Sequence, residues 1–196
     1  MIRFAIAFVL IFSLPVYAED AIKDAPSVSE QAYRLSQSGK PREAIELLNA
    51  ALDKDPNNLT LLITRADCFL SAGEDRKAVA EYEHLLKLKP SGLRKMVIFN
   101  NLAYLLATSP DDDVRDGKRA VDFAETAKLL SEKPSPYVID TLAAAYAEAG
   151  QFDKAVEAGH EAIKLAPENQ REEFRKYLKL YEARKPRRET REKPQK

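Results

Sequence analysis

Apolar residues recur at every third or fourth position through most of the chain, the spacing that gathers them on one face of an α-helix. Within residues 137–148, for example, Val138, Ile139, Leu142 and Tyr146 share one such face. Residues suited to ending a helix, glycine in some places and proline in others, separate the apolar segments. They are Gly39, Gly73 and Gly150, and Pro56, Pro90 and Pro167. The pattern predicts an all-α chain of short paired helices.

The pattern also repeats itself. Pro56 and Pro90 are 34 residues apart, and small and apolar residues precede both at the same offsets. A third copy precedes Pro167. Small residues stand where the two helices of a pair would touch: Ala32, Ala44, Ala66, Ala78, Ala103, Ala120, Ala143 and Ala155. Self-similarity at a fixed period predicts units that bury their apolar faces against one another.

A fourth copy is hidden by an insertion. Residues 100–106 match a first helix and residues 120–127 match a second, but the turn between them is about five residues longer than elsewhere. Four repeats then span approximately 25–58, 59–92, 96–135 and 136–169. Residues 170–184, with Phe174, Leu178 and Tyr181 on one stripe, are expected to form a capping helix.

The 34-residue period, with these small, aromatic and proline positions, resembles the tetratricopeptide repeat. The resemblance covers most of residues 25–169 and implies a right-handed superhelical solenoid of about four helix–turn–helix repeats plus the capping helix. Residues 100–103, 115–121 and 140–143 are similar to a unit of exported bacterial members of this family. Such a fold indicates binding and says little about which ligand is bound.

The resemblance also implies where a ligand would bind, because in this family the first helix of each repeat lines a concave groove. Carried over position by position, the family pattern assigns eight residues to the groove: Ser29, Tyr33, Ile63, Asp67, Asn100, Tyr104, Tyr137 and Asp140. Tyrosines with asparagine and aspartate suit a protein ligand, although the same tyrosines also suit packing against the neighbouring repeat. No lysine occupies the positions that clamp carboxylates in some members, so Asp67 and Asp140 favour a basic or hydrogen-bond-donating ligand.

The N-terminus has the pattern of a secretory signal. Arg3 precedes an apolar run over residues 4–14, and Val16 and Ala18 suit a signal peptidase that cuts before Glu19. The run is shorter than the roughly 20 residues of a membrane-spanning helix. We expect a signal peptide at 1–18, a linker at 19–24 and a periplasmic or extracellular mature protein. An uncleaved segment would instead tether the chain to a membrane.

Charge is balanced overall and uneven locally. Lys and Arg total 31, as do Asp and Glu, which gives no global bias toward nucleic acid. Residues 184–196 hold seven basic and two acidic residues, so 185–196 are expected to form a basic disordered tail. Such a tail is either simply solvated or binds an anionic envelope surface.

Few residues suggest catalysis or metal binding. His84 and His160 have no partner at metal-ligand spacing. Cys68, the only cysteine, is interpreted as a buried thiol rather than a nucleophile, although a lone thiol outside the cytoplasm can pair between chains. The aspartates of 111–116 lack calcium-loop spacing, and Asp113 or Asp116 is expected to cap the next helix.

Together these patterns predict a non-catalytic, exported adaptor or scaffold that binds a protein or peptide in its groove, with a role in bacterial envelope assembly. They predict no cofactor, no metal, no nucleic-acid partner and no membrane span in the mature chain. The alternative is an envelope- or polysaccharide-binding structural module that uses the basic tail.

Overall fold

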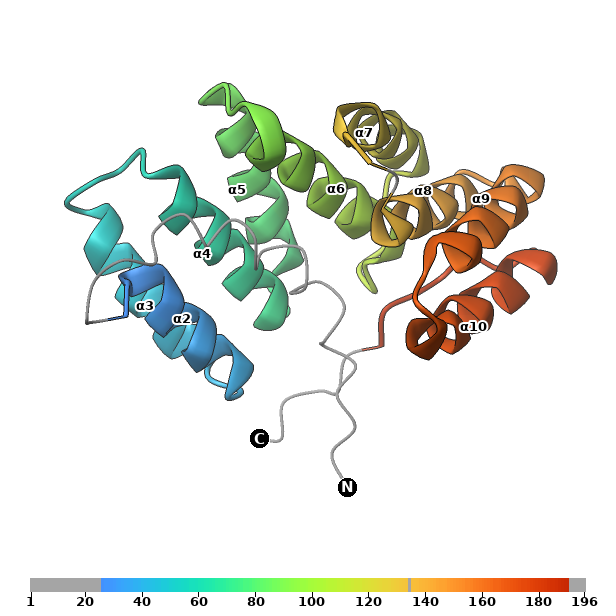
Figure 1. The fold of residues 1–196 in the computed structure, drawn as a ribbon. Helices are drawn as coiled ribbons and strands as arrows, with labels where there is room; N and C mark the ends of the chain where they lie inside the picture. Colours follow the sequence, from blue (N-terminus) through green and yellow to red (C-terminus); the bar gives the residue numbers. More distant parts are fainter. Residues whose placement is uncertain (1–25, 134, 191–196) are drawn as a thin grey trace. The chain divides into compact units, whose positions relative to one another are not determined.

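A computed structural model describes residues 26–133 and 135–190, drawn as a ribbon in Figure 1. Throughout these ranges the regular structure is helical and no strand is present, as predicted. The expected signal peptide at 1–18, the linker at 19–24 and the last six residues of the tail lie outside the described residues. The chain divides into two compact units, Met1–Arg94 (unit 1) and Lys95–Lys196 (unit 2), which are described separately below.

Unit 1 contains two helix pairs. They are α2 (Val28–Gln37) with α3 (Pro41–Leu52), and α4 (Leu59–Ser71) with α5 (Asp75–Lys87). Gly39 and Gly73 follow α2 and α4 with φ angles of +81° and +76°, a conformation that suits glycine and ends each helix where the sequence predicted. Asn58 caps α4, since its side chain accepts a hydrogen bond from Leu61 N at 3.1 Å.

The core of unit 1 is built from small side chains at the crossings and larger ones between them. Ala32, Ala44, Leu48 and Cys68 form one buried cluster across α2, α3 and α4. Tyr82 of α5 is also fully buried. Alanine at the crossings lets the helices approach closely, which is the packing role expected for it from the sequence.

Unit 2 holds most of α6 (Gly92–Thr108), then α7 (Gly117–Leu130), α8 (Pro136–Glu148), α9 (Phe152–Leu165), the 3₁₀ turn η3 (Glu168–Gln170) and α10 (Arg171–Glu182). The first helices, α6 and α8, are buried over much of their circumference. Helices α7 and α9 pack against α8, and Phe99 of α6 packs on Phe123 of α7 with 5.6 Å between the ring centroids. At the C-terminal end α10 packs against α9 (Figure 1) and buries Phe174, Leu178 and Tyr181, the stripe predicted for a capping helix.

The predicted insertion is the loop 109–116 between α6 and α7. Asp116 caps α7, because its side chain accepts a hydrogen bond from Arg119 N at 3.0 Å. Of the two capping residues that the sequence allowed, the structure selects Asp116. Gly117, the first residue of α7, lies against the end of α8: a Cβ at this position would be 2.6 Å from Ala149 N.

The tail requires a correction. The sequence predicted disorder from residue 185 onward, and for residues 185–190 this prediction is wrong. They have no regular secondary structure, but Arg187 is buried within unit 2. The physical reason is that a buried carboxylate, Asp140, and two tyrosines accept its guanidinium. Composition alone did not reveal these partners, which lie on other helices.

Candidate interaction surface

In unit 1, three of the four predicted groove residues are buried. Ser29 on α2 shares a hydrogen bond of 2.9 Å with Ser27 Oγ. Ile63 on α4 has no exposed surface, and Asp67 accepts a hydrogen bond from the Tyr82 hydroxyl of α5. Tyr33 is half-buried. Ile63 and Asp67 therefore serve the interior of unit 1, and Tyr33 is the most accessible of the four.

In unit 2, the predicted residues come from α6 and α8. Asn100 and Tyr104 lie one helical turn apart on α6, and both are buried. Tyr137 on α8 is half-buried and donates to Gln170 Oε1 at 2.7 Å. Asn100 Oδ1 has no hydrogen-bond partner among the described residues. Tyr104 and Asp140 are brought together by a residue that the sequence analysis did not assign.

That residue is Arg187, which enters from the segment after α10. Its side chain is 2% exposed, and it donates from Nη1 to Asp140 Oδ2 at 3.1 Å and from Nη2 to the Tyr104 hydroxyl at 2.7 Å. The guanidinium carbon lies 3.6 Å from the ring centroid of Tyr177 and 5.0 Å from that of Tyr104. Aromatic faces attract a cation placed over them. We call Tyr104, Asp140 and Tyr177 the arginine pocket.

Glu189, from the same segment as Arg187, adds a second carboxylate. Its Oε1 accepts from Arg187 Nη2 at 2.7 Å and Nε at 3.1 Å, and from the Tyr104 hydroxyl at 2.5 Å. The backbone also takes part, since Glu189 N donates to Thr108 O at 2.9 Å. The segment thus supplies both the cation, Arg187, and a carboxylate, Glu189, that accepts hydrogen bonds from it.

Burial shapes the protonation of this cluster. It raises the pKa of Asp140 to about 6, although the charge of Arg187 partly lowers it. It also raises the pKa of Tyr177 to about 12 and that of Tyr104 well above its usual range. At neutral pH the pocket therefore presents one carboxylate and two neutral phenols, which suits a single cation.

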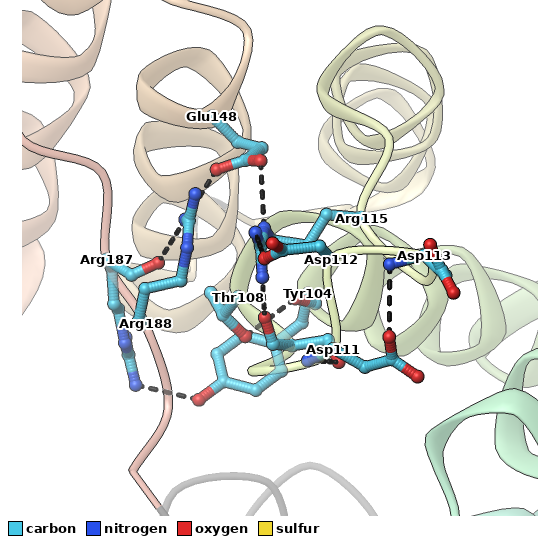
Figure 2. Close-up of polar contacts among 10 residues, drawn as sticks. Tyr104, Thr108, Asp111, Asp112, Asp113, Arg115, Glu148, Arg187 and Arg188 are labelled. Atoms are coloured by element: carbon cyan, nitrogen blue, oxygen red, sulfur yellow. Dashed lines mark hydrogen bonds and ion pairs between the residues drawn. The ribbon is translucent and has the colours of Figure 1, made fainter.

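A second set of polar contacts, shown in Figure 2, joins the segment after α10 to the end of α8 and to the inserted loop. Arg188 pairs with Glu148 Oε2 at 2.5 Å, at the C-terminal end of α8. Arg115, from the inserted loop, donates to Glu148 Oε1 at 3.2 Å and to Ser109 O at 2.7 Å, and it also pairs with Asp112. Glu148 therefore connects the inserted loop with the tail segment.

Comparisons with known proteins agree with this architecture. Models of the tetratricopeptide repeat match residues 35–94 and 136–169. This chain is a tetratricopeptide-repeat protein. Its fold is similar to the solved structure "MamA RS-1 ArsTM double mutant", with a TM-score of 0.63 and 20% identity over 84% of this chain and 86% of that one. No curated protein sequence matches it significantly.

The other polar candidates of this tetratricopeptide-repeat protein lie apart from the pocket. His84 and His160 are exposed on α5 and α9. Cys68 is buried, and burial together with the nearby charge of Asp67 raises its pKa to about 12, so the thiol stays protonated at neutral pH. This confirms the interpretation of Cys68 as a buried thiol.

Two further kinds of feature are absent from the described residues. Within residues 26–133 and 135–190, no cluster of His, Cys, Asp and Glu is arranged to hold a metal ion. In the same part of the tetratricopeptide-repeat protein, no helix combines the length and apolar character that crossing a membrane requires.

Sequence reasoning missed Arg187, Glu189 and Tyr177. One signal pointed toward them: Asp140 interrupts an apolar face of a first helix, where an acid requires a cation or donors. The basic residues after 184 were the obvious source of that cation within this tetratricopeptide-repeat protein. The separation of 47 residues between Asp140 and Arg187 hid the connection.

Proposed function

We propose that this protein is a non-catalytic scaffold that binds a protein or peptide partner on the surface of its first helices at Tyr33 or Tyr137, which we call the inner face. The observation that carries the proposal is in unit 2, where α6, α8 and α10 already hold an extended polypeptide segment through an inserted side chain. A surface that binds one extended segment has the shape and the donors and acceptors to bind another.

The chemistry of the site supports binding rather than catalysis. The polar groups of the pocket pair with one another, and the tyrosines keep their protons at neutral pH. A nucleophile would need a neighbouring base or a lowered pKa, whereas burial raises the pKa of Cys68. The proposal therefore includes no catalytic residue and no cofactor.

The proposed location is outside the cytoplasm. Residues 1–18 have the charge, apolar run and small-residue cut site of a bacterial secretory signal, with cleavage after Ala18. A scaffold exported to the periplasm would act there in assembling envelope proteins. N-terminal sequencing of the protein recovered from an exporting host should begin at Glu19, and an intact Met1 on membrane-bound protein would contradict cleavage.

Site-specific crosslinking tests the proposed function. A photo-crosslinking residue replaces Tyr33 or Tyr137, the two half-buried tyrosines of the predicted surface, in cells that export the protein. Matched controls carry the probe at Lys87 on α5 or Asp122 on α7, which are exposed on second helices. Tyr104 is less suitable because Arg187 covers it.

The expected result is one dominant crosslinked protein at an inner-face position and none at its control. Mass spectrometry of that species identifies the partner. Equal crosslinking at all four positions, or none at any of them, would contradict binding on this face.

A further inference from the structure

Arg187 is the single deeply buried anchor of the segment 185–190, and contacts of Arg188 and Glu189 nearer the surface supplement it. Arg187 is its buried residue, whereas Lys185, Arg188 and Thr190 are exposed. Two backbone hydrogen bonds join it to helices, one from Glu189 N to Thr108 O of α6 and one from Lys185 N to Leu180 O of α10. A segment with a single deep anchor and an exposed remainder resembles a bound peptide more than an element of the core.

The pocket suits a guanidinium in particular. A planar guanidinium can stack on the Tyr177 ring while it donates from Nη1 to Asp140 and from Nη2 to the Tyr104 hydroxyl. An ammonium is a compact charge that cannot stack in this way. The geometry therefore discriminates arginine from lysine.

The pocket also requires an occupant. Asp140 is 1% exposed, and Arg187 donates to its carboxylate from outside the helical repeats. A buried carboxylate without a cation or donors is unfavourable, so a peptide that displaces Arg187 must bring an equivalent group. Charge complementarity thus restricts what can replace the segment.

We propose that the arginine pocket is a recognition site for an arginine side chain on an extended segment of a partner protein, and that the segment 185–190 occupies it as an internal ligand. The proposal rests on the proposed binding function of the inner face and names the ligand class. The partner segment carries an arginine followed two residues later by an acid, the spacing of Arg187 and Glu189. Its binding displaces the internal ligand.

The test uses the full-length Arg187→Ala variant, which leaves the pocket without its arginine. The probe is a fluorescent synthetic peptide with the sequence of residues 185–196, and binding is followed by anisotropy. We expect the peptide to bind the variant and to bind wild type about tenfold more weakly or worse, because the internal ligand must first leave.

Two matched controls examine specificity. A peptide with lysine in place of the arginine at position 187 should bind the Arg187→Ala variant about tenfold more weakly, because it cannot stack or donate in several directions. Adding Asp140→Asn to the variant should weaken binding of the unmodified peptide. Equal binding of the arginine and lysine peptides would overturn the assignment to arginine.

Absence of peptide binding to a folded Arg187→Ala variant, with folding checked by circular dichroism, would show that the segment is a fixed part of the fold. Should the variant fail to fold, hydrogen exchange on the wild-type protein gives the answer. The Glu189 amide should exchange faster than the amides of residues 138–145 in α8, because the segment opens on its own. Equally slow exchange would overturn the proposal.

The outcomes separate this inference from the proposed function. A partner crosslinked at Tyr137 together with no peptide binding would retain the scaffold and remove the arginine site. Peptide binding together with no crosslinked partner would retain the pocket and contradict the scaffold function.

Discussion

Asp140 lies on α8 among mostly apolar and small residues, in surroundings that disfavour a negative charge. Its carboxylate remains the acceptor for Arg187 because the ion pair partly offsets the cost of burial. The two tyrosines of the arginine pocket stabilise the buried Arg187. Tyr177 stacks on the guanidinium, and Tyr104 both lies beside it and accepts a hydrogen bond from it. Protonation of Asp140 should therefore affect stability measurably.

The first prediction concerns pH. The folded pKa of Asp140, about 6, lies above its ordinary value of 3.8, so the folded chain holds this proton more tightly than the unfolded chain. The contribution of Asp140 to the free energy of unfolding is thus fully present below about pH 4 and is lost as the pH rises through 6. Urea unfolding of wild type and Asp140→Asn at several pH values measures it.

The Asp140→Asn variant retains every other titrating group. The pH dependence that those groups give to the free energy of unfolding therefore cancels when the two proteins are compared. The wild-type free energy of unfolding, relative to the variant, should fall by up to about 3 kcal/mol between pH 4 and pH 7. A difference that stays constant, or that grows with pH, would contradict a raised pKa for Asp140.

Part of this site could be predicted from the sequence and part could not. Family position places Tyr104 and Asp140 on first helices, and an acid at such a position favours a basic ligand. The structure supplies that basic group from the chain itself, 83 residues from Tyr104. The local sequence pattern cannot predict a contact between residues so far apart. A segment with few apolar residues, such as the one that holds Arg187, is predicted to be solvated.

The helices were more predictable than the site. Their periodicity, glycine ends and alanine crossings are local features, and the four helix pairs follow them. The start of α6 differed: the repeat alignment placed it at 96, whereas the helix begins at Gly92. Repeat spacing predicts the part of a helix that packs against the neighbouring helices. It does not predict how far the helix extends beyond that part.

A second prediction concerns the contact between α7 and α8. Gly117→Ala would place a Cβ 2.6 Å from Ala149 N and 2.7 Å from Glu148 C, and these backbone atoms cannot move aside as a side chain can. We expect a loss of about 1–3 kcal/mol in the free energy of unfolding. The matched control is Gly159→Ala in α9, where the Cβ meets Leu178 Cδ1 at 3.1 Å, the end of a flexible side chain.

Gly159→Ala should cost less than Gly117→Ala, because Leu178 can shift and alanine favours the helix by roughly 1 kcal/mol. Urea midpoints of both variants give the comparison. An equal or larger loss in the free energy of unfolding for Gly159→Ala would show that the close backbone contact at Gly117 does not make alanine unfavourable there.

Charge is distributed unevenly along the whole molecule: residues 19–183 carry 23 basic and 29 acidic side chains, whereas residues 184–196 carry seven basic and two acidic ones. A basic tail next to an acidic repeat domain is attracted to it, and the contacts of Arg187 with Asp140 and of Arg188 with Glu148 are two specific instances. Arg187 is thereby withheld from any anionic surface, and Glu148 partly neutralises the exposed charge of Arg188. This bears directly on the alternative function, in which the tail contacts the envelope.

The third prediction follows from that competition. The full-length Asp140→Ala variant keeps every cation of the tail but weakens the anchor of Arg187, so it should bind vesicles rich in phosphatidylglycerol more tightly than wild type. Binding by exposed cations should fall steeply between 50 and 300 mM salt, about fivefold or more, because the Debye length shortens. Cosedimentation across this salt range measures both effects. Wild type that binds these vesicles as tightly as the variant would show that the docked segment does not restrain the tail, and it would favour the envelope-binding module over the peptide-binding scaffold.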